Sequence, residues 1–589
     1  MIKKENIVYL LFPLIYLFYF IGMRGHIGFW YGADWFMVNG EYLGQFFLKP
    51  GGWSEYLGNF LLQFYRWRWV GAAIMTLMAL GMFIVTRKIS GKLGVPGNWL
   101  LPAVIPVLLV WGLQCYMGVS LSEVLRVLFF YLSVWGYIAV SNQKVRCGVF
   151  SLLFPFFYLL LPSGGCIFLY LTFGLYELFY SKGNVRYGYW VLWAFLLCVY
   201  PFLWQRWMWI MPSEDLYILS RIGTGSGVSD VLRLLYGYVF LLMGLAYLGK
   251  KSAKKGKRLF YWCELAVIVA GCVFGVKYCY QKNTEHFLRM DRAVERGDWD
   301  EVLKVANELE QWSREEFFYV SLALASKGEL GEKLFNYPVW GIGCLYLPRG
   351  LEYHVSVVGS EFYYRLKIPN EALHWTLQAA IASPMGINFR TLKRLVDLNI
   401  QKGDQRLADK YLSVMEQTML NGKWIRNRRA LMQASQTERV LPDDRIDFFI
   451  GGRPFLSDMA RVLDAGRSPE MTLDYILCGL LLNKDLSKFC QLFAHFYRVT
   501  DGKKIPKAYE EAILMALSMG NPDLSSYTIS PDRRRAFADY TALLRHAGKS
   551  KKDAAEIMKG FKDSWWYYYH FIEPKDMDLK GNLLEYQSH

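Results

Sequence analysis

Acidic residues are scarce in the first half of this 589-residue chain. Residues 1–280 hold 10 acidic and 24 basic residues, whereas the remainder holds 41 and 43, so almost the whole formal charge of +16 belongs to the first half. A nucleic-acid-binding protein would instead carry its basic excess on a soluble surface that phosphates can reach. The distribution therefore argues against a nucleic-acid partner, and we expect the basic residues to act as membrane topology signals.

Motifs of metal and thiol chemistry are missing as well. The eight histidines are scattered and the chain contains neither HExxH nor CxxC, so the sequence proposes no metal site and no cofactor. Only three of the ten cysteines, Cys344, Cys478 and Cys490, follow residue 280. Three cysteines cannot all pair, so we expect small buried residues rather than a disulfide framework. A single disulfide, such as Cys478 to Cys490, remains an alternative.

What the first half does contain is long apolar runs. Residues 7–23 carry no charge and no small-x-small cleavage site follows them, which predicts an uncleaved first span rather than a signal peptide. Lys and Arg gather in alternate loops, which predicts a cytoplasmic N-terminus and an extracytoplasmic chain after the last span. Nine segments qualify in all: 7–23, 70–86, 99–119, 124–140, 148–162, 165–180, 189–211, 231–249 and 259–280.

Two features of these runs leave alternatives open. Residues 148–180 form either a tight transmembrane hairpin or a re-entrant pair that does not fully cross. Charges inside the runs either snorkel to the interface, which we expect, or form internal pairs and pathways. The residues concerned are Glu177, Arg206, Arg233 and Glu264.

The second half is amphipathic with helical spacing. Residues 298–301 have the form of a capping box, with Asp298 accepting a backbone N–H and Glu301 reaching back. Turn residues recur at about one or two multiples of a period in the mid-thirties, which is typical of helix–turn–helix repeats. Residues 334–361 and 435–469 do not fit and are expected to be irregular insertions. The turn residues are Gly297, Gly328, Gly403, Asn483 and Gly548.

The segment 371–415 resembles tetratricopeptide (TPR) repeats, in which small residues pack between the helices of each pair. Alternating helical hairpins of no named family remain the alternative. The matching positions are Ala372, Ala379, Pro384, Leu395, Gly403, Ala408 and Tyr411.

The first outer loop, residues 24–68, is rich in aromatics and holds several acids, among them Asp34 and Glu55. Within it, residues 52–65 predict an amphipathic helix whose aromatic face lies in the membrane interface. The second outer turn is short and contains Glu123, with Arg126 one helical turn further.

This arrangement resembles the GT-C superfamily of lipid-dependent glycosyltransferases, which have acidic residues in the first two outer loops. The resemblance implies that Asp34 is the catalytic or metal-linked acid and Glu123 the second acid. Arg126 would stabilise the departing lipid phosphate. Asp34 stands alone, however, whereas the family usually has an acidic pair close behind its first span.

The whole chain resembles an uncharacterised family of bacterial polytopic membrane proteins with a helical-repeat C-terminal domain. No activity comes with that resemblance. It is carried by Pro50-Gly51-Gly52, Tyr56, Phe60, Gln63-Phe64, the turn 297–300 and the aromatic run 565–569.

We therefore expect an all-α protein: a polytopic domain of about nine spans over residues 1–280 and an extracytoplasmic TPR-like solenoid over 281–589, in a bacterial inner membrane. The expected function is a scaffold, with a protein or envelope glycan on the concave face of the solenoid. The alternative is a GT-C-like glycosyltransferase that uses a sugar linked to a polyprenyl-phosphate lipid. A transporter comes third, because paired broken helices are not evident.

Overall fold

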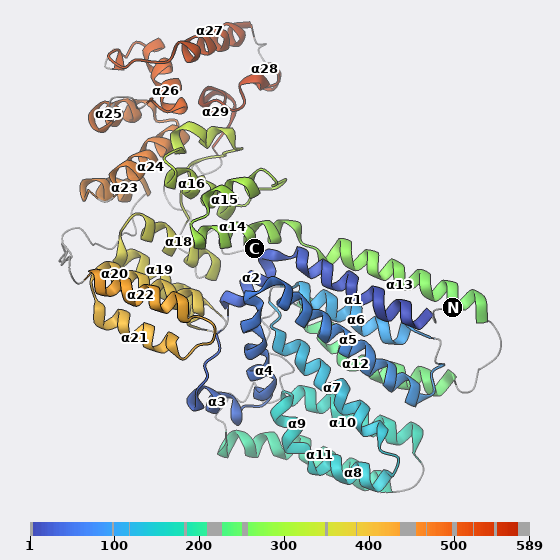
Figure 1. The fold of residues 1–589 in the computed structure, drawn as a ribbon. Coiled ribbons are helices and arrows are strands. Elements are labelled where there is room, and N and C mark those ends of the chain that lie inside the picture. The colour runs from blue at the N-terminus through green and yellow to red at the C-terminus, as the bar shows by residue number, and fades with distance from the viewer. Residues whose placement is uncertain are drawn as a thin grey trace. The chain divides into compact units, whose positions relative to one another are not determined.

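The computed structural model is all-α over the residues that it describes, which confirms the all-α part of the prediction (Figure 1). An isolated antiparallel bridge between Met37 and Thr418 is the one β-type pairing in that part of the chain. The described residues are 4–33, 35–96, 99–116, 118–181, 185–208, 226–249, 257–347, 352–383, 386–435, 455–466, 468–497, 504–521, 524–546 and 551–574.

The chain forms two compact units. The N-terminal unit comprises Met1–Glu285 together with the short segment Glu416–Gly422, and the C-terminal unit comprises His286–Met415 and Lys423–His589. The division after residue 285 lies close to the boundary expected at 280. The return of residues 416–422 to the N-terminal unit was not anticipated from the sequence.

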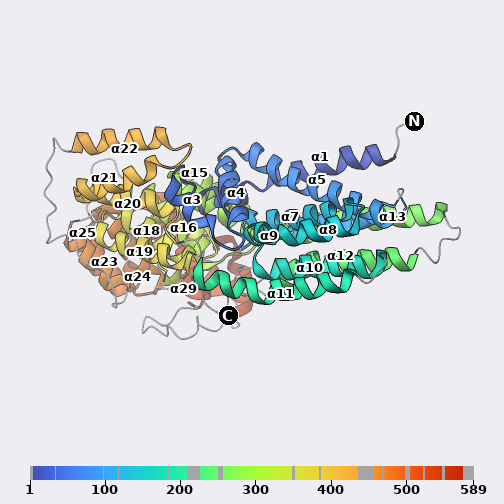
Figure 2. The same cartoon turned by 90° about the horizontal axis from the view of Figure 1, so that it is seen from below.

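Each of the nine apolar segments overlaps helical structure in the N-terminal unit. Here α5 packs against α1, α6 and α7, while α10 packs against α11 and α12, and these three lie side by side in Figure 2. The helices are α1 (Lys4–Gly22), α2 (Arg24–Ala33), α3 (Gly40–Phe47), α4 (Gly52–Leu62), α5 (Arg68–Leu93), α6 (Leu101–Cys115), α7 (Leu121–Ala139), α8 (Gln143–Leu152), α9 (Phe154–Leu160), α10 (Ser163–Tyr180), α11 (Val185–Trp207), α12 (Ser226–Gly249) and α13 (Lys257–Cys279), with a 3₁₀ turn at Gln63–Arg66.

Four of these helices are long and apolar enough to cross a membrane: Arg68–Leu93, Leu121–Ala139, Arg186–Trp207 and Val228–Tyr247. The run 148–162 is not one continuous helix. It breaks at Leu153 into α8 and α9, and Pro155 stands in the first turn of α9. Proline cannot donate the backbone hydrogen bond that would continue α8, so the break follows from the sequence.

The expectation that charges in the apolar runs snorkel is wrong for Glu177 and Glu264. Glu177 is fully buried, where its carboxylate accepts bonds from Arg146 Nε at 2.6 Å and the Tyr137 hydroxyl at 2.8 Å. The buried Glu264 carboxylate accepts the backbone N–H groups of Leu100 and Leu101 at 2.5 and 2.6 Å, at the start of α6. A buried carboxylate needs such partners, whereas a snorkelling one would have water.

The C-terminal unit is a stack of short antiparallel helices. Its turns include the predicted Gly297, Gly328 and Gly403, which have φ of 72°, 69° and 76°. Only glycine adopts this left-handed conformation at little cost, so these positions end helices. The helices are α14 (Lys282–Arg296), α15 (Trp299–Ala306), α16 (Arg314–Ser326), α17 (Leu330–Lys333), α18 (Tyr353–Arg365), α19 (Pro369–Ala382), α20 (Phe389–Lys402), α21 (Gln405–Glu416), α22 (Gly422–Ser435), α23 (Phe455–Asp464), α24 (Pro469–Leu482), α25 (Leu486–Phe496), α26 (Lys507–Ser518), α27 (Pro531–His546), α28 (Lys551–Ile557) and α29 (Trp565–Phe571), with 3₁₀ turns at Leu334–Asn336, Ile342–Cys344 and Met558–Phe561.

Packing in this unit is not confined to helices adjacent in sequence. The short α17 contacts both α24 and α26, and Gly331 leaves room for Tyr509, because a Cβ at position 331 would lie 2.7 Å from that ring. Helices α14–α18, α23–α27 and α29 therefore contribute to one hydrophobic core. In a simple solenoid each repeat contacts only its neighbours.

Several local expectations need correction. The expected irregular insertions contain the regular helices α18 and α23. Asp298 accepts the N–H of Glu301 at 3.2 Å, but the Glu301 carboxylate pairs with Arg289 at 2.9 Å instead of completing a capping box. The bridge left open between Cys478 and Cys490 is not formed, since both are buried free thiols. Pro384, Gly548 and residues 436–454 lie outside the described residues.

Candidate functional site: a charged cluster beneath the first outer loop

Helix α4, in the segment predicted to be the first outer loop, turns its small and polar face inward. Ser54, Gly58 and Asn59 are buried. A Cβ at Gly58 would lie 2.9 Å from the backbone nitrogen of Ser122, so glycine permits a close approach of α4 to α7. On the aromatic face of this helix, Tyr56 and Phe60 pack on an aromatic cluster of the same loop, whereas Trp53 is exposed. The placement of this face in the membrane interface stays a prediction.

Four charged side chains meet where α4 approaches α7. Arg126 is bonded to Glu123, one turn earlier on α7, and its second terminal nitrogen lies 3.4 Å from Glu55 Oε2. Lys49 Nζ lies 2.7 Å from the same Glu55 carboxylate. Glu123 and Arg126 are 4% and 7% exposed, so these charges are stabilised by one another rather than by water.

The turn at Gly51 holds this cluster against a third segment. Gly51 has φ of 67°, and a Cβ there would lie 3.0 Å from the Pro162 nitrogen and 3.4 Å from Arg126 Nε. Its N–H donates to Tyr158 O at 3.0 Å, and the Ser54 hydroxyl donates to Leu160 O. The first outer loop, the second outer turn and the Pro162 turn therefore converge on the Arg126 guanidinium.

Several polar atoms in this region are buried with no hydrogen-bond partner among the described residues, among them Arg126 Nε, the Tyr236 hydroxyl, the Tyr65 hydroxyl and Gln114 Nε2. A neighbouring cavity of about 10 Å³, lined in part by Tyr65, Gln114 and Ser120, has room for about one water molecule. The arrangement can hold a small polar molecule. A sugar or a lipid headgroup would need the surrounding segments to separate.

The three candidate residues from the sequence have different outcomes. Asp34 lies outside the described residues. The structure brings Glu123 and Arg126 together, and their predicted catalytic roles stay predictions. Glu55 and Lys49 complete the cluster and were missed as site residues. The signal that could have indicated them is the Pro50-Gly51-Gly52 motif, because a left-handed turn there directs Lys49 back towards Glu55.

The inserted segment, Glu416–Gly422, completes the first outer loop within the N-terminal unit. Val38 N donates to Gln417 O at 3.0 Å, the Tyr31 hydroxyl donates to Asn421 Oδ1 at 3.1 Å, and Arg66 donates to Leu420 O. Leu420 has φ of 65°, a conformation that costs a branched residue roughly 1 kcal/mol or more. Such strain persists only where the surroundings fix it.

This inserted segment also reaches the aromatic cluster next to the charges. Met419 packs against the cluster formed by Phe36, Tyr42 and Phe46. Lys49 Nζ in turn lies 5.7 Å from the centre of the Phe46 ring while it pairs with Glu55. A continuous set of contacts therefore runs from Met419 through the cluster to Arg126.

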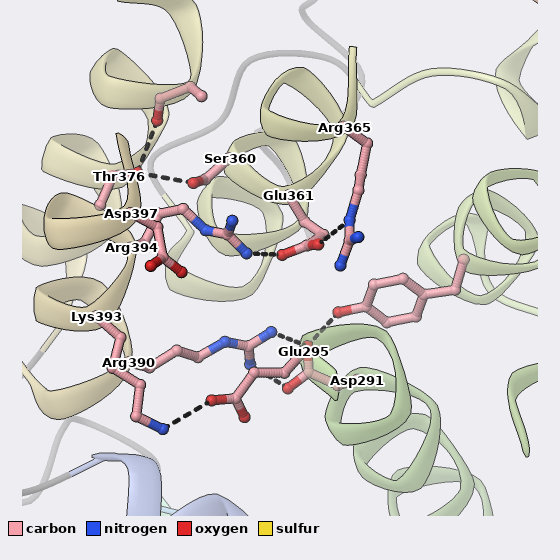
Figure 3. A network of polar contacts seen from close by, with 12 residues as sticks. Asp291, Glu295, Ser360, Glu361, Arg365, Thr376, Arg390, Lys393, Arg394 and Asp397 are labelled. Carbon is pink, nitrogen blue, oxygen red and sulfur yellow. Dashed lines mark hydrogen bonds and ion pairs between the residues drawn. The ribbon is translucent and has the colours of Figure 1, made fainter. Parts of the chain in front are cut away.

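The C-terminal unit contains a second charged network (Figure 3). Arg390 bonds Asp291 with both terminal nitrogens, one at 2.9 Å, and Lys393 lies 3.3 Å from Glu295. Burial raises the pKa of Glu295, but the neighbouring Lys393 and Arg390 outweigh this effect and hold it at about 2.

The same face of α20 reaches α18. Arg394 bonds Glu361, which also accepts Arg365 Nε at 2.7 Å. The network ties α14, α18 and α20 together, and Glu361 is shared by two arginines.

Fold and site together define a class: an all-α protein in which a unit with long apolar helices precedes a unit of stacked short helices. Residues 2–572 match the model of the DUF6057 family, described as a family of unknown function, and the chain belongs to that family. No curated protein and no solved structure matches the chain significantly.

Proposed function

We propose that the protein is a multi-pass membrane protein whose C-terminal unit is an extracytoplasmic scaffold for a protein or envelope-polymer partner. The observation that supports the membrane part is the exposure of a long apolar helix. Only 11% of the apolar window in Arg186–Trp207 is buried inside the protein, and Val191 is 73% exposed. Water would make such a surface prone to aggregation, whereas lipid tails would solvate it.

Contacts between two basic loops support the proposed orientation. Arg146 donates to the Ser181 hydroxyl at 2.5 Å, and Arg186 donates to Ser181 O at 3.1 Å. The loop after α7 and the loop after α10 therefore share one end of the N-terminal unit, as two cytoplasmic loops should. Residues 250–258 add six more basic residues to the same predicted side.

The scaffold part of the proposal follows from the stacked helices, which offer a large surface relative to their core. Neighbouring apolar side chains are exposed on α19 and before α20: Leu377, Ile381 and Ile387, with Ile381 83% exposed. A photo-crosslinking residue at position 381 in living cells should give a protein or glycan adduct. The matched control is the exposed position Gln433 on α22, where no adduct should form. Equal products at both positions would contradict the scaffold.

A GT-C-like glycosyltransferase is the second candidate. The favouring observation is that Glu55 and Glu123 share Arg126 where the first two outer loops meet. This activity requires Asp34→Asn and Glu123→Gln to abolish glycan transfer while the protein stays inserted. Glu41→Gln, at an exposed acid of the same loop, serves as the control. Unchanged surface glycans in all three variants would reject the glycosyltransferase and leave the scaffold as the remaining candidate.

A further inference from the structure

Two cysteine thiols meet at one end of the N-terminal unit. Helix α6 ends at Cys115 and helix α13 ends at Cys279, and the two helices pack against each other. The Cys115 and Cys279 thiols lie close enough to interact electrostatically. Gly112, one turn before Cys115, would place a Cβ 3.8 Å from Cys279 Sγ. The thiol of Cys279 therefore lies over the last turn of α6.

Aromatic side chains surround this pair. The Tyr19 hydroxyl lies 3.5 Å from Cys115 Sγ, and the Tyr19 ring contacts Trp111 and Tyr280 with centroid separations of 5.0 and 6.3 Å. Cys115 is buried, whereas Cys279 is partly exposed.

We propose that Cys115 and Cys279 are joined by a disulfide in the mature protein. This proposal rests on the proposed topology, which puts the ends of α6 and α13 on the extracytoplasmic side, where oxidation is possible. Helices α6 and α13 already pack against each other at this point, so the two thiols start on neighbouring turns. Its oxidant is an extracytoplasmic dithiol oxidoreductase in its disulfide form.

The exposed thiol reacts first. Cys279 loses its proton and its sulfur attacks one sulfur of the oxidoreductase disulfide, which breaks and releases one thiolate. Cys115 then loses its proton and attacks the Cys279 sulfur of this mixed disulfide, releasing the second thiolate. The two protein thiols have given up two protons and two electrons, and the oxidoreductase disulfide has become a dithiol.

The bond would fix the place where the chain leaves the N-terminal unit. Cys279 directly precedes the start of α14 at Lys282, while Cys115 ends a helix packed on α1, α5 and α13. A covalent tie here would hold α13 in position against α6. The link closes a loop of more than 160 residues, and the stability gained from a disulfide is largest for long loops because it restricts the unfolded chain most.

The test uses the full-length protein in its native membrane. Intact cells are treated with N-ethylmaleimide before lysis, and peptides are analysed by mass spectrometry with and without reductant. We expect a peptide pair linked through Cys115 and Cys279 and lighter by two hydrogens than the separate peptides. The link should be absent in Cys115→Ser and Cys279→Ser and retained in Cys272→Ser, a control on the same α13 helix.

A reporter fused after Gln281 separates the two proposals. If it is active outside the cytoplasm while both thiols carry N-ethylmaleimide, the disulfide proposal is overturned and the topology stands. If the reporter is found in the cytoplasm and both thiols carry N-ethylmaleimide, the proposed topology is wrong and the disulfide proposal fails with it. A linked peptide with an active reporter supports both.

Discussion

In the core of the C-terminal unit, the carboxylate of Glu511 accepts a hydrogen bond of 2.6 Å from the backbone N–H of Trp565. Glu511 is fully buried, and burial raises the pKa of this carboxyl to about 7, although Lys507 and Arg533 act in the opposite direction. The side chain therefore changes its charge near neutral pH, far above the range of an exposed glutamate.

This shift predicts the pH dependence of stability. Between about pH 4.5 and 7 the folded state binds a proton at Glu511 that the unfolded state has released, so the contribution of this group falls as pH rises through that window. The full change is about 3 kcal/mol. Glu511→Gln should flatten this part of the curve of apparent unfolding temperature against pH. An unchanged slope in the variant would show that Glu511 does not titrate there.

The Arg126 cluster predicts a double-mutant cycle. Arg126→Met removes the cation beside the buried Glu123 carboxylate, while Glu55 keeps its pair with Lys49, and should destabilise the protein by about 3 to 5 kcal/mol. Adding Glu123→Gln to that variant should recover part of the loss, since one uncompensated charge disappears. Thermal unfolding in detergent measures both.

Arg233→Met is the matched control for this cycle. Arg233 pairs with Asp230 at 3.0 Å, but the two side chains are 64% and 61% exposed. Loss of such a pair should cost no more than about 1 kcal/mol. If Arg126→Met were as mild as Arg233→Met, the Arg126 cluster would not stabilise the junction of the outer loops.

Whether the sequence predicts a feature of this structure depends on how far apart along the chain the interacting residues lie. Gly297, Gly328 and Gly403 end helices through their own backbone freedom, so local pattern suffices to find them. The pairing of Glu177 with Arg146 joins residues 31 positions apart. In the sequence Glu177 looked like an interfacial charge and Arg146 like a basic residue of a cytoplasmic loop.

The candidate site shows the same limit more strongly. Glu123 and Arg126 are neighbours on one helix face, so their contact follows from helical spacing. Glu55 joins Arg126 only because Gly51 and Gly58 let α4 approach α7, and the pairing of Met37 with Thr418 connects segments that no periodicity relates. Such contacts depend on tertiary packing.

The close packing of α18 on α19 predicts a strong effect of a small substitution. A Cβ at Gly359 would overlap with the Trp375 ring, so Gly359→Ala should lower stability by about 1 to 3 kcal/mol. Gly560→Ala meets nothing within 4 Å and should change stability by less than about 0.5 kcal/mol. Equal unfolding temperatures for these two variants would reject the close contact between Gly359 and Trp375.

The inserted segment predicts a distant effect on the first outer loop. Met419→Ala removes a side chain from the cluster of Phe36, Tyr42 and Phe46, and α3 and α4 should open more often as a result. Hydrogen exchange of residues 40–62 should become about tenfold faster, a change equivalent to about 1.4 kcal/mol. Leu407→Ala, at an exposed position on α21, should leave that exchange unchanged. Similar exchange in both variants would mean that residues 416–422 do not support the loop.

The central claim is that this is a multi-pass membrane protein with its C-terminal unit outside the cytoplasm, and paired reporter fusions test it most directly. Fusions after Gly249, ahead of six basic residues, and after Gln281, beyond the last predicted span, should lie on opposite sides of the membrane. We predict a cytoplasmic signal at Gly249 and an extracytoplasmic signal at Gln281. A cytoplasmic signal at Gln281 would contradict the orientation, the number of crossings and the proposed exposure of the scaffold.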